Sequence, residues 1–456
     1  MKGNKFVSMV VVLSMLALVL TSCAPKVVKE TVVVEKAVKE TVVVEVTPVP
    51  AAPVTITVWF TPRGTVQEYT LTMIKLFEAR NPGITVAYEP MPDIMQKLRT
   101  GVAAGELPDF VYVDENVALE FLDILKPIPD WVMTGDKIRT RFGDFVADFY
   151  NWDGKYYILP YGVMTGGALF YNKEILEQYG YTPEDIPKTW DEFIEMAKEM
   201  TIWEGDELKQ AGFAIRGQEQ FIWDSVLFQE HGYRFLNCKT CSVDSSEAKE
   251  AAKFMMDIYN VHKLDSLTGL PAMEAFGTGK APFGYFWSWY IGFMARTYPQ
   301  IKYGTTTLPT FTGEPPYGRI SYNLGFAITA TDPAREEAAW KFYDFLMSNE
   351  FIDGWSPLRG SAPVSAEVHK GARYQTAPWA GVIKVLEPGN GRTEGPWPEE
   401  TADMLNEMLA SILAGEDIDT TMDDTARRAT AILQAGDYCR LLIGKEGFEK
   451  IFGQPW

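Results

Sequence analysis

Histidine and cysteine are scarce in this chain, with 3 histidines and 4 cysteines among 456 residues. The histidines stand far apart at positions 231, 262 and 369, and no metal-ligand spacing joins them to the cysteines. Because a structural zinc site needs four ligands, we expect no metal ion. The turns carry neither a Walker nor a dinucleotide glycine pattern, so we also expect no nucleotide and no other cofactor.

Basic residues are in the minority, because 61 Asp and Glu outnumber 42 Lys and Arg and leave a net charge of −19. The Lys and Arg residues do not cluster along the sequence, whereas a surface that binds phosphates needs them together. Nucleic acid is therefore not expected as a partner. Long apolar runs are also lacking after residue 20, so no segment of the body has the length needed to span a ~30 Å membrane core.

The apolar run that is present begins the chain. Lys2 and Lys5 precede about fifteen apolar residues, 6–20, which is the pattern of a signal peptide over residues 1–22. The following LTSC, residues 20–23, resembles the bacterial lipobox, in which the cysteine receives a diacylglycerol. We therefore expect a lipidated Cys23 and a mature protein held on the outer face of the cell membrane. The alternative is an ordinary secreted chain with an incidental cysteine.

Residues 23–53 have the composition of a tether. The phrase VKETVVVE occurs twice, its lysines and glutamates cancel in charge, and Pro48, Pro50 and Pro53 follow. The repeat keeps no single helical face and its β-branched valines disfavour helix, so we expect an extended spacer. A two-strand hairpin, or pairing between chains through the valines, is the alternative.

Three cysteines lie beyond the leader: Cys238 and Cys241 in NCKTC, and Cys439 near the end. In an oxidising exterior the first two could close a small disulfide loop. A thioredoxin-like role would place the first cysteine at a helix start after a strand, whereas this motif falls where we expect a hairpin turn. A structural disulfide and reduced thiols are the two interpretations that this leaves.

Strand and helix patterns alternate through the rest of the chain. Residues 54–60 (VTITVWF), 84–88 (ITVAY) and 110–113 (FVYV) are typical of strands, with helical spacing between them. This β-α-β-α-β order predicts a parallel sheet covered by helices, with ligands at the C-terminal ends of its strands. The 403 residues after residue 53 (456 minus 53) suit two lobes of this α/β class. The later expected elements are strands at 161–172 and 212–216 and helices at 245–260, 336–347 and 401–413.

Ten motifs follow one another in the sequence: VTITVWF, NPGITV, GELPDFVYVDE, LKPIP, WDGKYYILPYG, FYNKEI, PKTWDEFIEMAKEMT, GTGKAPFGYFWSW, YGTTTLPTFTGEP and EEAAWKFYDFLMSNE. In this order they resemble the family 1 extracellular solute-binding proteins, the receptors of ATP-driven (ABC) importers, to which maltodextrin-binding protein belongs. The resemblance covers roughly residues 54–442. Each motif alone is weak, and the fixed order of all ten carries the resemblance.

The resemblance implies a two-lobed clamp of the periplasmic-binding-protein type (type II) that hinges shut around a solute. By analogy, residues 54–160 with 302–350 form lobe 1, and residues 161–301 with 351–456 form lobe 2. Crossings near residues 160, 302 and 350 would form the hinge. The resemblance also implies a receptor rather than an enzyme, which acts as a monomer and delivers a sugar or oligosaccharide to an importer permease.

A sugar site needs flat aromatic side chains together with carboxylate, amide or guanidinium groups, because the sugar ring has C–H faces and a hydroxyl rim. The segment FGYFWSWY, residues 283–290, holds six aromatics, and the resemblance places a sugar-stacking tryptophan in it. We favour Trp287 over Trp289, since one of two alternating strand residues is expected in the core. Trp59, at the end of the first strand, joins this aromatic set.

Polar ligand contacts are expected from the loops at the strand ends of lobe 1. The resemblance points to Asp114 and Asn116, which follow the third strand, although both could instead cap a helix. Arg63 occupies the equivalent place after the first strand.

In the second lobe the resemblance points to Glu219 and Phe221 as an acidic and an aromatic contact. It adds Gly325, whose missing side chain would let the backbone approach the ligand, and Arg359 in PLRGSAP. The family's late helix presents a tryptophan, whereas the corresponding stretch here is ADMLNEM.

Three rival functions remain open, one of which is an adhesion or scaffold protein that would show no small-molecule response in thermal melting. A cell-surface glycoside hydrolase would need two carboxylates about 5 to 10 Å apart, and Glu219 and Asp114 could meet in that way. The same clamp could instead hold a solute that is not a sugar. An anion would need several converging basic residues, for which Arg63 and Arg359 are the candidates, whereas a polyamine would suit the acids and aromatics.

Overall fold

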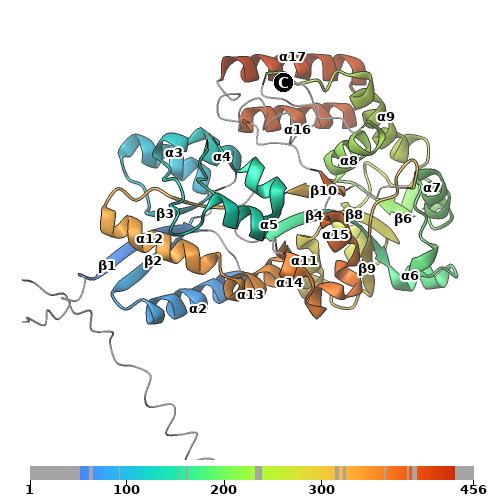
Figure 1. The fold of residues 1–456 in the computed structure, drawn as a ribbon. Helices are drawn as coiled ribbons and strands as arrows, with labels where there is room; N and C mark the ends of the chain where they lie inside the picture. The colour runs from blue at the N-terminus through green and yellow to red at the C-terminus, as the bar shows by residue number, and fades with distance from the viewer. Residues whose placement is uncertain are drawn as a thin grey trace, which may run out of the picture. The chain divides into compact units, whose positions relative to one another are not determined.

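The computed structural model describes residues 52–60, 65–91, 93–113, 115–152, 154–160, 163–231, 239–313, 318–321, 325–363, 366–387, 390–392 and 398–436. The chain divides into two units, Met1–Pro53 and Val54–Trp456. The signal peptide, Cys23 and nearly all of the tether lie outside the described residues, so the predictions for them stay untested. Helices surround the sheets of the second unit (Figure 1).

The first sheet has four strands in the order β11, β3, β1, β2. Its parallel strands are β1 (Val54–Phe60), β2 (Ile84–Pro90) and β3 (Phe110–Val113), joined by helices as the alternating pattern predicted. β11 (Gly325–Ile328) comes from much later in the chain and pairs antiparallel with β3. This sheet is therefore built from two distant stretches of sequence.

Helices lie on both faces of the first sheet. Phe60 of β1 stacks on Trp355 of α13 (Asn349–Arg359), with ring centroids 6.3 Å apart. The neighbouring Trp59 points to the opposite face, as alternation in a strand requires, and lies under Lys97 of α3 (Ile94–Ala104). The remaining helices of this part are α2 (Thr65–Arg80), α4 (Glu115–Glu120), the 3-10 turn η1 (Leu122–Ile124), α5 (Gly135–Phe149) and α12 (Pro333–Leu346).

The second sheet is centred on β4 (Val163–Asn172). The strands that pair antiparallel with β4 are β8 (Phe283–Trp287), β9 (Tyr303–Thr306), β10 (Gly318–Ser321) and β12 (Ala362–Pro363). Farther out, β7 (Phe213–Ala214) runs parallel to β8 and β13 (Gly391–Arg392) runs parallel to β10. A separate hairpin joins β5 (Ile202–Glu204) to β6 (Glu207–Gln210).

The residues of β4 alternate between two hydrophobic cores, which shows that both faces of the second sheet are covered. Leu169 and Tyr171 belong to the larger core, and Ala168 and Phe170 to the smaller one. The helices and 3-10 turns of this part are α6 (Lys173–Gln178), η2 (Pro183–Asp185), α7 (Trp190–Glu199), α8 (Glu219–His231), α9 (Ser246–Asn260), α10 (Ala272–Gly277), α11 (Trp289–Thr297), α14 (Ala366–His369), η3 (Ala372–Gln375), α15 (Ala377–Leu386), α16 (Glu399–Leu413) and α17 (Ile418–Ala435).

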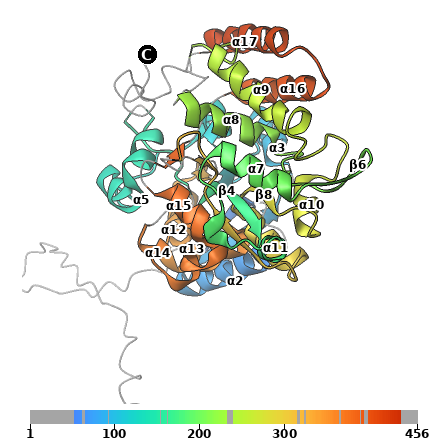
Figure 2. The same ribbon diagram turned by 90° about the vertical axis from the view of Figure 1, so that its right-hand side faces the viewer.

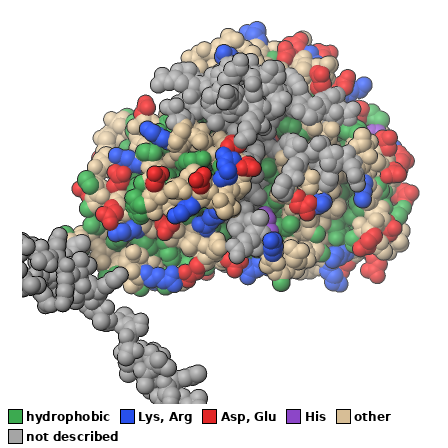
Figure 3. Space-filling model, viewed as in Figure 1, with side chains coloured by type: hydrophobic (Ala, Val, Ile, Leu, Met, Phe, Trp, Pro, Cys, Tyr) green, Lys and Arg blue, Asp and Glu red, His purple; other side chains and the backbone are tan. Residues whose placement is uncertain are grey.

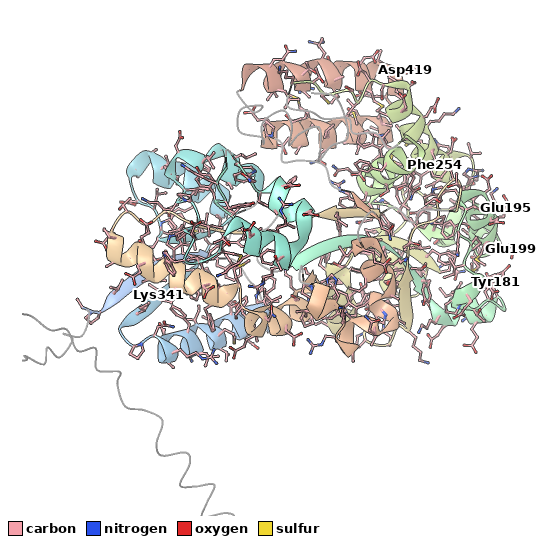
Figure 4. All side chains as sticks on the ribbon, in the orientation of Figure 1. Tyr181, Glu195, Glu199, Phe254, Lys341 and Asp419 are labelled. Carbon is pink, nitrogen blue, oxygen red and sulfur yellow. The ribbon has the colours of Figure 1, made fainter. Side chains whose placement is uncertain are left out.

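The last two helices form a hairpin that packs on α9 (Figures 1 and 2). Lys249 of α9 binds Asp419 at 3.2 Å and Asp423 at 2.7 Å, both on α17. Asp419 is labelled in Figure 4, as are Tyr181 and Glu199, whose side chains are hydrogen bonded at 2.6 Å on another part of the surface. These exposed pairs contribute little stability each.

The strand pairing shows that the chain crosses from one sheet to the other at positions that differ from the predicted ones. We expected residues 302–350 to return to lobe 1, but β9 and β10 pair with β4, so these two strands, 303–306 and 318–321, belong to the second sheet. Helix α13, expected in lobe 2 beyond residue 350, packs on α2, where Tyr69 Oη donates to the Phe351 carbonyl at 3.1 Å. The chain thus passes between the sheets after residues 160, 321 and 359.

The described part of the chain contains no helix that is both long and apolar enough to cross a membrane. On the face seen in Figure 3, acidic and basic side chains are interspersed and no continuous basic patch is visible.

Candidate ligand-binding site

Trp287 is the last residue of β8 and pairs with Gly167 of β4. Its side chain is on the sheet face that α8 covers, and Phe221 of α8 meets it edge to face, with centroids 5.2 Å apart and planes at 81°. Trp287 is 9% exposed. The structure therefore brings together Phe221 and Trp287, two of the three aromatic residues that we predicted for the second lobe.

A charged pair that we did not predict completes this cluster. The guanidinium carbon of Arg319, on β10, lies 5.3 Å from the ring centroid of Phe221 and 5.6 Å from that of Trp287. The same guanidinium forms an ion pair with Asp224 of α8, whose side chain is 2% exposed. We call Phe221, Asp224, Trp287 and Arg319 the second-sheet cluster.

Local geometry explains how three elements meet at this cluster. Phe221, Asp224 and Ser225 are three and four residues apart on α8, so they share the helix face that lies on the sheet. Ser225 Oγ and Tyr285 Oη are 3.1 Å apart, and a side chain on Gly167 would occupy the space of that tyrosine hydroxyl. Burial raises the pKa of Tyr285 to about 12, so its hydroxyl stays protonated in this contact.

Glu219 lies at the start of α8, and both of its carboxylate oxygens accept hydrogen bonds from within the protein. Its Oε2 accepts a hydrogen bond from the Gly217 N–H at 2.8 Å, and its Oε1 accepts one from Tyr259 Oη at 2.7 Å. Burial, together with this carboxylate, raises the pKa of Tyr259. Glu219 is 8% exposed, so its observed role is to hold the turn before α8, and its predicted ligand contact has no support in this geometry.

Asp265 supports the same turn from behind. Its Oδ2 accepts from the backbone N–H groups of Ile215 and Arg216 at 2.7 and 3.0 Å, and its Oδ1 accepts from Ser266 N–H at 2.8 Å. Burial raises the pKa of Asp265 to about 6, against the opposing effect of these three donors. Asp265 borders a surface pocket of about 930 Å³ beside the β5–β6 hairpin, and none of the predicted site residues lines that pocket.

The side chain of Trp59, in the first sheet, is buried within the protein. Its Nε1 donates to Glu89 Oε2 at 3.0 Å, and Lys97 Nζ lies 5.9 Å from the ring centroid. With 6% exposure and a satisfied N–H, Trp59 has the environment of a structural residue. Its predicted ligand contact stays a prediction.

Gly325 is required where the chain passes between the sheets. A side chain there would lie 2.7 Å from the Leu159 carbonyl oxygen, and Gly325 forms a bridge with Pro160. We expected this glycine to let the backbone approach a ligand, whereas the structure shows that its missing side chain accommodates residue 159.

Trp289 and Arg359 lie near one another at a second passage. Gly360, which ends α13 with a positive φ of 76°, would place a side chain 2.6 Å from the Trp289 carbonyl oxygen. The Trp289 ring meets Tyr290 edge to face and packs against the smaller core, away from the Trp287 face. Arg359 is partly buried at the end of α13. The structure thus separates Trp289 from Trp287.

Several predicted residues cannot be placed. Arg63, Asp114 and Cys238 lie outside the described residues, as does the side chain of Asn116. Cys241 is 4% exposed, and its N–H donates to Thr430 Oγ1 at 3.0 Å. Because Cys238 lies outside the described residues, the predicted disulfide stays a prediction. Within the residues that the structure describes, no group of three or more His, Cys, Asp or Glu is arranged to hold a metal ion.

Sequence reasoning missed Asp224 and Arg319, although one signal for the first was present. Asp224 interrupts the apolar stretch FIWDSVLF at a position three residues from Phe221. A carboxylate on the apolar face of a helix must be buried and therefore needs a cationic partner. No local pattern identifies that partner as Arg319, because it belongs to a strand far along the chain.

Comparison with known proteins gives a consistent result. Residues 72–380 match the family described as Bacterial extracellular solute-binding protein. A protein of Brucella abortus (strain 2308), named as a binding protein without a stated ligand, is 27% identical over 378 residues, which are 79% of this chain and 88% of that protein. The maltotriose-binding protein of Pyrococcus abyssi (strain GE5 / Orsay) is 25% identical over 304 residues, 64% of this chain and 62% of that protein.

Solved structures confirm the predicted fold class. The maltose/maltodextrin-binding domain MalE from Bdellovibrio bacteriovorus, solved with maltotriose bound, superposes with a TM-score of 0.67 at 21% sequence identity. The match covers 84% of this chain and 100% of that domain. The fold is therefore the α/β periplasmic-binding-protein fold.

Proposed function

Because this chain belongs to the bacterial extracellular solute-binding protein family, we propose that it captures a neutral sugar or short oligosaccharide and delivers it to an ABC importer permease. The observation that carries this proposal is the second-sheet cluster, which combines two aromatic rings with a guanidinium and a carboxylate. The face of an aromatic ring can stack on the C–H face of a pyranose, and the polar pair suits the hydroxyls of the sugar. The maltotriose-binding relatives add support.

The charges of the site favour a neutral ligand over a polyamine. A cation would need carboxylates without internal partners, but Asp224 is paired with Arg319 and both oxygens of Glu219 accept hydrogen bonds within the protein. The Asp224–Arg319 pair has no net charge with which to attract a charged ligand. An uncharged polyol is therefore the favoured cargo.

The hydrolase alternative loses its main candidate for the same reason. Glu219 is buried and hydrogen bonded on both oxygens, which does not suit a proton donor or nucleophile at a glycosidic bond. The matching family consists of binding proteins, as we expected for a receptor that is not an enzyme.

We further propose closure of two lobes as the mechanism of capture. The sheets are connected by three passages of the chain, after residues 160, 321 and 359, and such short connections are the usual place for a hinge. A ligand that contacts both lobes stabilises only the closed form, so the population shifts toward it. A monomer held by a lipid on Cys23 would present that closed form to its permease at the membrane.

The test is calorimetry of maltotriose binding to the purified mature protein and to Trp287→Ala. We expect truncation of Trp287 to weaken binding by roughly 1 to 3 kcal/mol, because a stacking surface is lost. Trp203→Ala is the control, since Trp203 is 37% exposed on the β5–β6 hairpin. Equal affinity of wild type and Trp287→Ala would remove Trp287 from the site.

A further inference from the structure

The second-sheet cluster places one guanidinium against two aromatic rings. Arg319 lies 5.3 Å from the centroid of Phe221 and 5.6 Å from that of Trp287, while the two rings are perpendicular to each other within about 10°. Each ring is attracted to the same cation, and the planar guanidinium suits contact with ring faces. Arg319 thus restrains the orientation of the ring that would stack on a sugar.

Asp224 restrains Arg319 in turn and cancels its charge. The Asp224 side chain is 2% exposed and that of Arg319 is 19% exposed, so solvent screens their interaction only weakly. Asp224 Oδ1 is buried and has no hydrogen-bond partner within the residues that the structure describes. An acceptor in that state favours a ligand or neighbouring group that donates a hydrogen bond.

The position of Arg319 on the strand adds to its effect. Arg319 precedes Ile320, which pairs with Gly166, so Arg319 and Trp287 flank β4 at the level of Gly167 and project from the same face. Phe221 and Asp224 approach that face from α8. The four side chains therefore form one continuous cluster from three elements.

We propose that Arg319 and Asp224 determine the ligand specificity of this surface. Arg319 orients the rings of Trp287 and Phe221, and Asp224 keeps the surface electrically neutral, so that it accepts hydroxylated, uncharged ligands and discriminates against acidic ones. This inference rests on the proposed function, and it assigns a substrate class, neutral rather than acidic sugars, to two named residues.

The first experiment needs no ligand. The indole ¹⁵N–¹H signal of Trp287 is assigned in the purified mature chain from its absence in Trp287→Phe, and it is then recorded in Arg319→Met. We expect this signal to shift or broaden, because the cation over the ring is gone. The control is Arg335→Met, since Arg335 pairs with the buried Asp109 at 3.3 Å in the first sheet. A Trp287 signal at the wild-type position in Arg319→Met would overturn the orienting role.

The second experiment measures selectivity by calorimetry with maltotriose as the neutral probe and a trimer of galacturonic acid as the acidic probe. Asp224→Asn removes the negative charge that is paired with Arg319, so the ratio of the two affinities should move at least about tenfold toward the acidic trimer. Asp109→Asn, the matched change in the first sheet, should keep the wild-type ratio. An unchanged ratio in Asp224→Asn would overturn the neutralising role.

A double variant guards against misfolding of the single ones. Asp224→Asn with Arg319→Met removes both charges at similar volume, a change that buried ion pairs often tolerate. It should fold and should return the affinity ratio to the neutral side, whereas a ratio equal to that of Asp224→Asn would contradict the proposal. If wild type bound neither probe, the proposed function would fail for these sugars, and the Trp287 signal would still decide the role of Arg319.

Discussion

Beside each of the two sheets lies a buried aspartate paired with an arginine, and the surroundings of the two pairs differ. In the first sheet, Asp109 Oδ2 accepts hydrogen bonds from Thr57 N–H at 2.9 Å and from Thr57 Oγ1 at 3.1 Å, and the Arg335 side chain stays 43% exposed. In the second sheet, Asp224 has Arg319 as its partner, with two aromatic rings beside it.

The difference shows how one kind of pair can serve two purposes. Asp109 joins β3 to β1 through backbone and hydroxyl donors, so its arginine is an accessory on the surface. Asp224 depends on its arginine, and that arginine in turn contacts the residues predicted to bind ligand. We therefore expect changes in the first pair to affect local stability, and changes in the second pair to affect both stability and recognition.

The largest effect is expected for Arg319→Ala. This change leaves the carboxylate of Asp224 buried without a counter-charge, which typically costs about 3 to 5 kcal/mol of unfolding free energy. Urea denaturation followed by tryptophan fluorescence measures the loss. A loss below about 1 kcal/mol would place this pair in the same class as exposed ion pairs.

A pH-dependent effect of intermediate size is expected for Asp265→Asn, behind the turn that leads into α8. Because the pKa of Asp265 is raised to about 6 from 3.8, the folded protein holds this proton more tightly than the unfolded chain does. The free energy of unfolding of wild type should therefore fall relative to that of Asp265→Asn as the pH rises from 4 to 6, by up to about 3 kcal/mol.

Denaturation at several pH values measures this difference, which should be constant above pH 7. A difference between wild type and Asp265→Asn that stayed the same from pH 4 to pH 7 would show that the burial of Asp265 does not raise its pKa.

The smallest effect is expected for Arg335→Ala, on α12 beside the first sheet. Arg335 is half exposed, and Thr57 continues to donate two hydrogen bonds to Asp109, so the loss should stay below about 1 kcal/mol. Ligand affinity, measured with the sugar that wild type binds, should not change. A loss as large as that of Arg319→Ala would remove the distinction between the two pairs.

Local patterns in the sequence predicted much of the first sheet. The alternation in residues 54–60, the helical spacing that follows and the stop at Asn81-Pro82-Gly83 all correspond to β1, α2 and the turn before β2. Gly83 has a φ of 98°, which only glycine adopts without strain. Periodicity and turn residues act within a few positions, so one sequence suffices to recognise them.

Local periodicity and turn residues could not predict contacts between segments that are far apart in the sequence. No local feature states that β9 and β10 pair with β4, and we therefore placed these two strands in the wrong part of the molecule.

The candidate site was predicted in the same uneven way. An aromatic-rich strand is visible in the sequence, so Trp287 could be named in advance, and the family resemblance pointed to Phe221. The choice of Arg319 as partner of Asp224 depends on how α8 lies across β10, which is set by packing of the whole second sheet. Glu219 could be identified as a polar residue near the site, but its hydrogen bonds with Tyr259 and Gly217 follow only from the fold.

The central claim is that this receptor binds an uncharged, hydroxylated ligand. The most direct measurement is a thermal-shift comparison of the mature protein with neutral oligosaccharides, uronic acid oligomers and spermidine, each at the same series of concentrations. We expect at least one neutral sugar to raise Tm in a saturable way, while the charged ligands have little effect. At one hundred times Kd that sugar should add about 2.7 kcal/mol to the free energy of unfolding. A saturable rise with spermidine or a uronic acid oligomer and none with any neutral sugar would contradict it.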